Sequence, residues 1–166
     1  MNRPTFQSAW TAARRIVAPI NQSQKVANLI GGSVAKNINL TPPHGWTNTC
    51  ALRLSYALNY SGVVIPKIRG KTVSGADKRA YFFRVRDVID FLNHAWGKPD
   101  LVLPFPESKE SKLDKRQGII LFEVKGWQDA NGHATLWNGA TCYDHCYFNE
   151  PGANYRTERA SFWALP

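Results

Sequence analysis

Residues 46–62 of the chain read WTNTCALRLSYALNYSG, and the most regular pattern of the sequence lies here. Small and apolar side chains recur in it at the i, i+3, i+4 and i+7 spacing of an amphipathic helix: Ala51, Leu54, Ser55 and Leu58. Asn48 or Thr49 is suited to cap the first turn, and Gly62 stands just past the expected end. The stretch therefore predicts a helix that begins close to Cys50.

Cys50 falls in the first turn of this helix, where the partial positive charge of the helix end favours a thiolate over a thiol. The thiolate is the nucleophilic form of cysteine, so the position suits covalent catalysis. A small buried core residue is the other interpretation of a single cysteine in an apolar helix. The nucleophilic interpretation requires a base elsewhere in the chain.

His133 is the candidate base, because it follows a Gly-containing turn at the start of an expected strand. An imidazole within hydrogen-bond reach of Cys50 can stabilise the thiolate and later protonate a leaving amine. A hydrogen-bonded histidine at a strand end is the structural alternative. His44, His94 and His145 have weaker cases: His44 lies in a Pro/Gly loop, and His94 lies on an expected helix with apolar neighbours.

A third polar group should hold the His133 ring in the required tautomer. Asp144 is the first choice, because it follows His133 on the next segment, which would lie alongside if the two segments pair. Asp129, Asn138 and Asn149 are the alternatives.

The remaining pattern predicts an α+β fold, with helices first and strands later. The expected helices are one from Phe6 to before Pro19, one around residues 26–30 that stops at Gly31, and one capped by Asp87 that ends at Gly97. Expected strands are 81–85, 118–124 and 133–137, the last two forming an antiparallel hairpin across a turn at 126–132. Residues 63–65 are β-branched, 67–80 and 104–116 read as loops, and 141–148 reads as a third strand or a tight loop.

Length and composition indicate one globular domain over residues 1–166, with 43% hydrophobic residues. No run approaches the length of a membrane span, so no membrane insertion is expected. The first ten residues lack a continuous apolar segment, so we expect no cleavable signal peptide. The net charge of +9 points to an anionic partner, which can be nucleic acid, anionic lipid, an acidic protein or an acidic polymer.

Three cysteines fit one disulfide and one free thiol, with Cys142 and Cys146 close together and Cys50 apart. A disulfide would need an oxidising compartment. Zinc binding by Cys142 and Cys146 with His145 or His44 ranks lower, because no second ligand pair at standard spacing is visible.

Three segments together resemble the type VI secretion amidase effectors, specifically their fourth family, which belongs to the NlpC/P60-like, papain-like peptidoglycan amidases. These segments are WTNTCALRLS at 46–55, GHATLW at 132–137 and CYDHCYF at 142–148. The resemblance runs from about Trp46 to the C-terminal region, and the first 40 or so residues match less clearly.

The resemblance implies a papain-like domain in which the nucleophile helix packs on a mainly antiparallel sheet. It implies cleavage of the γ-D-glutamyl–meso-diaminopimelate bond of peptidoglycan stem peptides, with Cys50 as nucleophile, His133 as base and Asp144 as acid. Cys142 and Cys146 match a disulfide near the acid. The backbone N–H of Cys50 would help to hold the oxyanion.

The resemblance further implies delivery by the type VI secretion machinery into the periplasm of rival Gram-negative cells, and a cognate immunity protein that blocks the site. We expect no cofactor and no metal. Trp46 and Trp137 are expected to flank the cleft, although each taken singly fits a core aromatic. Two other functions are weighed: transglutaminase-like acyl transfer on the same scaffold, and, from the charge alone, a nucleic-acid-binding domain.

Overall fold

The computed structural model describes residues 1–107, 111–127 and 132–166. The helices are α1 (Phe6–Ile16), α2 (Gln22–Ile30), α3 (Gly32–Ile38), α4 (Cys50–Asn59), α5 (Val85–Trp96) and a 3-10 turn, η1 (Ser111–Leu113). The strands are β1 (Thr72–Ser74), β2 (Ala80–Phe82), β3 (Leu101–Pro104), β4 (Gly118–Lys125), β5 (Gly132–Trp137) and β6 (Arg156–Ala164). The α+β class expected from the sequence is confirmed.

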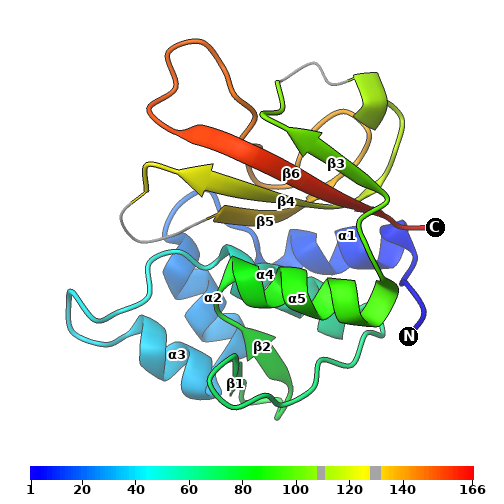
Figure 1. Cartoon of the computed structure of the whole chain (residues 1–166). Coiled ribbons are helices and arrows are strands. Elements are labelled where there is room, and N and C mark those ends of the chain that lie inside the picture. Colours follow the sequence, from blue (N-terminus) through cyan, green and yellow to red (C-terminus); the bar gives the residue numbers. More distant parts are fainter. Residues whose placement is uncertain (108–110, 128–131) are drawn as a thin grey trace.

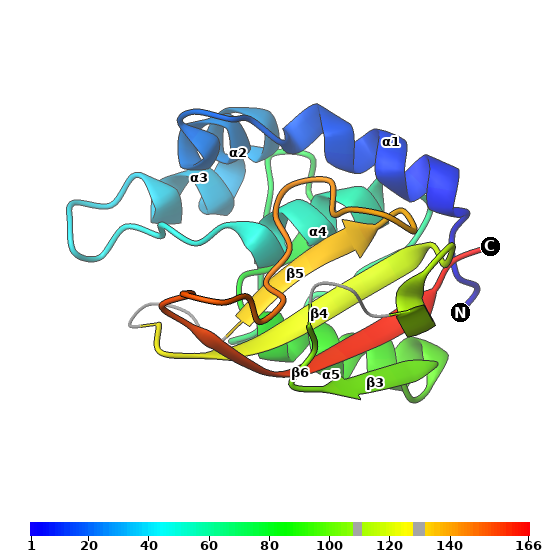
Figure 2. The same cartoon turned by 90° about the horizontal axis from the view of Figure 1, so that it is seen from above.

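One four-stranded antiparallel sheet lies across the helices α4 and α5 (Figure 1), in the order β3-β6-β4-β5. Seen from above, α1 runs along the β5 side of this sheet (Figure 2). The pair β1 and β2 forms a separate two-stranded sheet at the opposite side of the helices. Since β5 is the last strand in the order, its outer edge is available to the loop that follows it.

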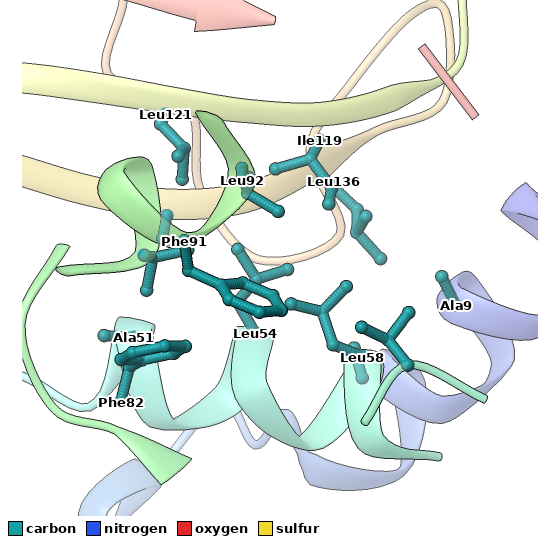
Figure 3. Close-up of a cluster of buried hydrophobic side chains, with 14 of the residues drawn as sticks. Ala9, Ala51, Leu54, Leu58, Phe82, Phe91, Leu92, Ile119, Leu121 and Leu136 are labelled. Atoms are coloured by element: carbon teal, nitrogen blue, oxygen red, sulfur yellow. The ribbon is translucent and has the colours of Figure 1, made fainter. Parts of the chain in front are cut away.

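The helix α4 is the centre of the molecule, and all ten of its residues are buried. Ala51, Leu54 and Leu58 point to the sheet and to α5, where they meet Ile119, Leu136 and Leu92, among others (Figure 3). On another side of α4, Leu52 and Tyr56 pack in a second cluster with residues of α2 and α3. The expectation of an amphipathic helix is thus wrong, because a second layer covers the side expected to face water.

Polar side chains on α4 have partners inside the protein. Ser55 Oγ donates to the carbonyl of Ala51 at 2.8 Å and accepts from the N–H of Phe82 at 2.9 Å. Asn59 Nδ2 donates to the carbonyl of Ala80 at 2.9 Å. These bonds offset the cost of burying polar atoms and attach α4 to β2.

Several boundaries differ from the sequence-based expectation. α5 begins at Val85 with Arg84 as its N-cap, so Asp87 lies in the first turn and is not the cap. Of the two alternatives expected for residues 141–148, a third strand or a tight loop, the structure shows a loop. The helix α3 and the strands β1, β3 and β6 were not expected. The expected loop 104–116 contains the short helix η1, and its residues 108–110 lie outside the described residues, as do residues 128–131 of the expected turn.

Among the described residues, no helix combines the length and apolar character needed to cross a membrane.

Candidate active site

Cys50 is the first residue of α4, and Thr49 is its N-cap. The oxygen Oδ1 of Asn48 accepts a hydrogen bond from the backbone N–H of Cys50 at 3.1 Å. Both residues expected to cap the helix therefore lie at its start, and Asn48 supplies the side-chain acceptor. The thiol is 2% exposed, with Sγ 3.8 Å from the carbonyl oxygen of Gly132. A buried cysteine thus faces the first residue of β5.

His133 is the second residue of β5, where it pairs with Phe122 of β4. Its ring is 5% exposed, and its Nε2 lies 3.1 Å from Oδ2 of Asp144. This is an ion-pair distance, although the N–H direction misses the geometry of a hydrogen bond. Tyr147 covers another side of the ring, with its centroid 4.8 Å away in an edge-to-face arrangement. The histidine is held between its neighbours and is largely shielded from water.

Asp144 reaches His133 because the chain turns back along the free edge of β5. In this turn the N–H of Asn138 donates to the carbonyl of Thr141, and Cys142 pairs with Trp137 as an isolated bridge. Continuing that antiparallel register by two residues brings Asp144 opposite Thr135. The sequence-based expectation that a returning segment brings Asp144 alongside His133 agrees with this path.

The Asp144 carboxylate accepts from several donors. Its Oδ1 accepts from the hydroxyl of Thr135 and from the backbone N–H of His145, and its Oδ2 accepts from Arg53 Nη2 at 2.8 Å and faces His133. A buried carboxylate is tolerated only when it is paired in this way.

Asp144 and His133 each shift the pKa of the other. Burial alone would raise the pKa of Asp144, but His133, Arg53 and Thr135 outweigh it and hold the pKa well below its usual range. Burial likewise lowers the pKa of His133, whereas Asp144 and Cys50 favour its charged form and raise the pKa to about 9. At neutral pH the histidine is therefore an imidazolium beside a carboxylate.

Three residues of this network were not identified from the sequence: Arg53, Thr135 and Tyr143. Arg53 is a buried arginine, 8% exposed, whose Nη1 donates to Thr49 Oγ1 at 3.1 Å and whose Nε donates to Tyr143 Oη at 3.4 Å. Arg53 is the only charged residue in the α4 sequence, three residues after Cys50, which is a signal that the sequence does contain. Thr135 and Tyr143 carry no comparable signal.

The two tryptophans occupy different surroundings. Trp46 is half-buried and stacks on Phe83, with ring centroids 4.9 Å apart. Trp137 is buried in the cluster of Leu113 and Phe148, and its Nε1 donates to the carbonyl of Leu113 at 3.0 Å. Cys50 belongs to a different cluster. The structure thus gives Trp137 a packing role and does not bring it beside Cys50.

Cys142 and Cys146 form a disulfide that brackets Asp144. Their sulfurs are bonded to each other, so the alternative of zinc binding by these thiolates is wrong. No group of three or more His, Cys, Asp or Glu side chains suited to a metal ion occurs within residues 1–107, 111–127 and 132–166.

The alternative third groups lie elsewhere. Asn138 Oδ1 accepts from the N–H groups of its own turn, and Asn149 bonds to Thr157 of β6. Asp129 lies outside the described residues. Of the other histidines, His145 contacts the site through its backbone N–H, which donates to Asp144, and through its ring, which lies against Tyr147.

Comparison with known proteins shows which family the chain matches. The model of the family described as type VI secretion system (T6SS), amidase effector protein 4 (Tae4) matches residues 46–163. No match was found among curated proteins.

Solved structures align over nearly the whole chain. The effector–immunity complex Tae4–Tai4 from Enterobacter cloacae is 39% identical, with a TM-score of 0.87 over 99% of this chain and 100% of that chain. Tae4 from Salmonella typhimurium in complex with Tai4 from Enterobacter cloacae is 40% identical, with a TM-score of 0.86 and the same coverage. Tae4 from Enterobacter cloacae is 38% identical, with a TM-score of 0.84 over 99% of this chain and 98% of that chain. The chain therefore belongs to the Tae4 family of type VI secretion amidase effectors.

Proposed function

We propose that the protein is a cysteine amidase that cleaves the γ-D-glutamyl–meso-diaminopimelate bond of peptidoglycan stem peptides. Cys50 is the nucleophile, His133 the general acid and base, and Asp144 the group that orients His133. The observation that carries the assignment is that His133 interacts with both Cys50 and Asp144 in a buried site of an amidase effector.

In the first half-reaction, Cys50 Sγ attacks the γ-glutamyl carbonyl carbon as a thiolate. His133, whose Nε2 faces Asp144, presents Nδ1 to the reacting atoms and gives its proton to the departing diaminopimelate amine. The C–N bond breaks, and a γ-glutamyl thioester of Cys50 remains. In the second half-reaction, neutral His133 takes a proton from water, the hydroxide oxygen adds to the thioester carbon, and the thiolate leaves.

Stabilisation of the oxyanion requires that the backbone N–H of Cys50 be free to donate to it. The backbone N–H of Cys50, expected to help hold the oxyanion, already donates to Asn48 Oδ1. The Asn48 side chain must therefore release this N–H when the tetrahedral intermediate forms. Trp46, four residues before Cys50 and half-buried, is proposed to form part of the cleft wall.

We propose that the type VI secretion machinery delivers the protein into the periplasm of target Gram-negative cells. Members of the family are described as type VI amidase effectors, and two of the solved relatives are complexes with the immunity protein Tai4. A cognate immunity protein of that kind would protect the producing cell by covering the site around Cys50. The disulfide between Cys142 and Cys146 suits an oxidising compartment such as the periplasm.

The test is mass spectrometry of muropeptides after digestion of Gram-negative peptidoglycan with the parent protein, Cys50→Ala and His133→Gln. We expect new fragments cut between D-Glu and diaminopimelate with the parent and none with either variant. His94→Gln, at an exposed histidine on α5, is the matched control and should cleave like the parent. Cleavage by folded Cys50→Ala would overturn the assignment, and acyl-transferred products in place of free amine would point to a transferase.

A further inference from the structure

Arg53 is a buried cation three residues after Cys50 on the same helix. A buried arginine is costly unless its donors are used, and here three nitrogens of the guanidinium have partners. Nη2 donates to Asp144, Nη1 to Thr49 and Nε to Tyr143. The guanidinium thus joins the helix that carries Cys50 to the loop that carries Asp144, across 91 residues of sequence.

The same oxygen of Asp144 faces two cations. Oδ2 lies 2.8 Å from Arg53 Nη2 and 3.1 Å from His133 Nε2. Oδ1 is occupied by Thr135 and the backbone N–H of His145. The carboxylate therefore has little freedom to rotate, and its negative charge is shared between the imidazolium and the guanidinium.

We propose that Arg53 is a positioning residue of this site: its guanidinium fixes the Asp144 carboxylate against His133, and its charge weakens the hold of that carboxylate on the imidazolium proton. The catalytic part of this proposal rests on the proposed function. A general acid must give up its proton to the leaving amine, so too strong an attraction to Asp144 would slow that transfer. Arg53 supplies the opposing charge from a buried position, 8% exposed.

The titratable groups around this pair come from two elements. α4 contributes Cys50 and Arg53, and the loop after β5 contributes Tyr143, Asp144 and Tyr147. Burial, followed by the charge of Asp144, raises the pKa of Tyr143, so this residue is a neutral phenol near pH 7 and adds no charge of its own. Removing Arg53 thus takes away a positive charge that lies 2.8 Å from Oδ2 of Asp144, the same oxygen that His133 faces.

The first experiment follows the His133 ring by NMR titration in the parent, Arg53→Met and Arg53→Lys, with His133→Gln to assign the signal. Loss of a nearby positive charge favours protonation, so Arg53→Met should raise the pKa of His133 by about one unit. Arg53→Lys keeps the charge and should leave the pKa close to that of the parent. An unchanged pKa in folded Arg53→Met would overturn the proposal.

The second experiment measures turnover of a purified muropeptide. Arg53→Met should lower kcat by about 10- to 100-fold, as loss of an orienting partner commonly does, with KM little changed. Arg53→Lys should recover part of that loss. Because Arg53 positions the Asp144 carboxylate, the further loss that Arg53→Met causes should be much smaller in the Asp144→Asn background than in the parent. Losses that multiply in the double variant would show an independent, structural role and would overturn the proposal.

The two experiments separate this proposal from the proposed function. If the parent cleaves no muropeptide, the proposed function fails, whereas the NMR titration still decides the role of Arg53. If Arg53→Met does not fold, Asp144→Asn and the double variant give the same comparison, because the double variant removes both charges of the pair. The proposal then requires a higher pKa of His133 in the double variant than in Asp144→Asn, and equal values overturn it.

Discussion

His133 shows how one side chain links the site to the stability of the protein. Its pKa is about 9 in the folded protein, against about 6.5 in an unfolded chain. A raised pKa stabilises the folded state fully below the unfolded value, and this stabilisation is lost as pH rises through the folded value. His133 therefore stabilises the folded protein fully below about pH 6.5, and this stabilisation is lost as the pH rises to about 9.

We predict that the free energy of unfolding of the parent falls by up to about 3 kcal/mol across this pH range. His133→Gln lacks the titrating group, so its free energy should change less over the same range. Urea denaturation near pH 6 and near pH 9.5 measures both values, and the difference between the two proteins removes the effects of other groups. Parallel pH dependences in the two proteins would contradict the prediction.

Asp144 gives a second prediction at this scale. Asp144→Asn keeps the shape of the side chain but removes the charge that holds His133 as an imidazolium. We expect kcat for muropeptide cleavage to fall on the order of 10⁴-fold, as in other triads that lose their acid. The matched control is Asp114→Asn, an exposed aspartate beyond η1, which should behave like the parent.

The sequence identified the three proposed catalytic residues because each has a local signal: a helix start, a strand start and an adjacent returning segment. Arg53 was missed although it is the only charged residue in the α4 sequence, because that signal does not reveal its partner. Its role depends on a contact with a residue 91 positions away, and no local pattern encodes that contact.

At the scale of elements, periodicity located α1, α4, α5, β4 and β5 but not β6. That strand has the burial pattern of a central strand, buried over much of its length without clean alternation, and its partners β3 and β4 are distant in sequence. The burial of α4 on all sides was missed because α2, α3 and the short sheet, which complete its cover, could not be placed from sequence. Local patterns thus gave the elements, and tertiary packing decided their order and exposure.

Leu54 tests the central position of α4. The side chain is fully buried between α4, α5 and the sheet, so Leu54→Ala should leave a cavity and lower the free energy of unfolding by about 2–5 kcal/mol. Val64→Ala, at a side chain that is 74% exposed, should change it by less than about 0.5 kcal/mol. Chemical denaturation compares the two, and similar losses would contradict the proposed core.

The loop that carries Asp144 is tied by the Cys142–Cys146 disulfide, which closes a short ring. For such a ring the expected stabilisation is about 2 kcal/mol. The double variant Cys142→Ser/Cys146→Ser should therefore unfold more easily and should cleave muropeptides more slowly, because the position of Asp144 is less restricted. Dithiothreitol should slow the parent and leave the double variant unchanged. A parent that keeps its full rate after complete reduction of the disulfide would contradict this.

The whole molecule carries a net charge of +9, and part of that charge lies on three exposed residues: Lys67 and Arg69 between α4 and α5, and Arg86 in the first turn of α5. An anionic wall should attract such a surface at low ionic strength, and salt should screen the attraction. The triple variant Lys67→Gln/Arg69→Gln/Arg86→Gln lowers the net charge from +9 by 3 to +6 without touching the site.

We therefore predict that the parent sediments with purified sacculi more completely than the triple variant at about 20 mM NaCl, and that the two converge at about 500 mM, where the screening length is only a few ångström. Cys50→Ala is used as the background for both proteins, so that the sacculi stay intact during the measurement. Cleavage of a small soluble muropeptide should be similar with and without the three substitutions, because the proposed chemistry takes place in a buried site. If the parent and the triple variant sediment equally at both salt concentrations, these three charges do not contribute to binding of the wall, and the prediction is wrong.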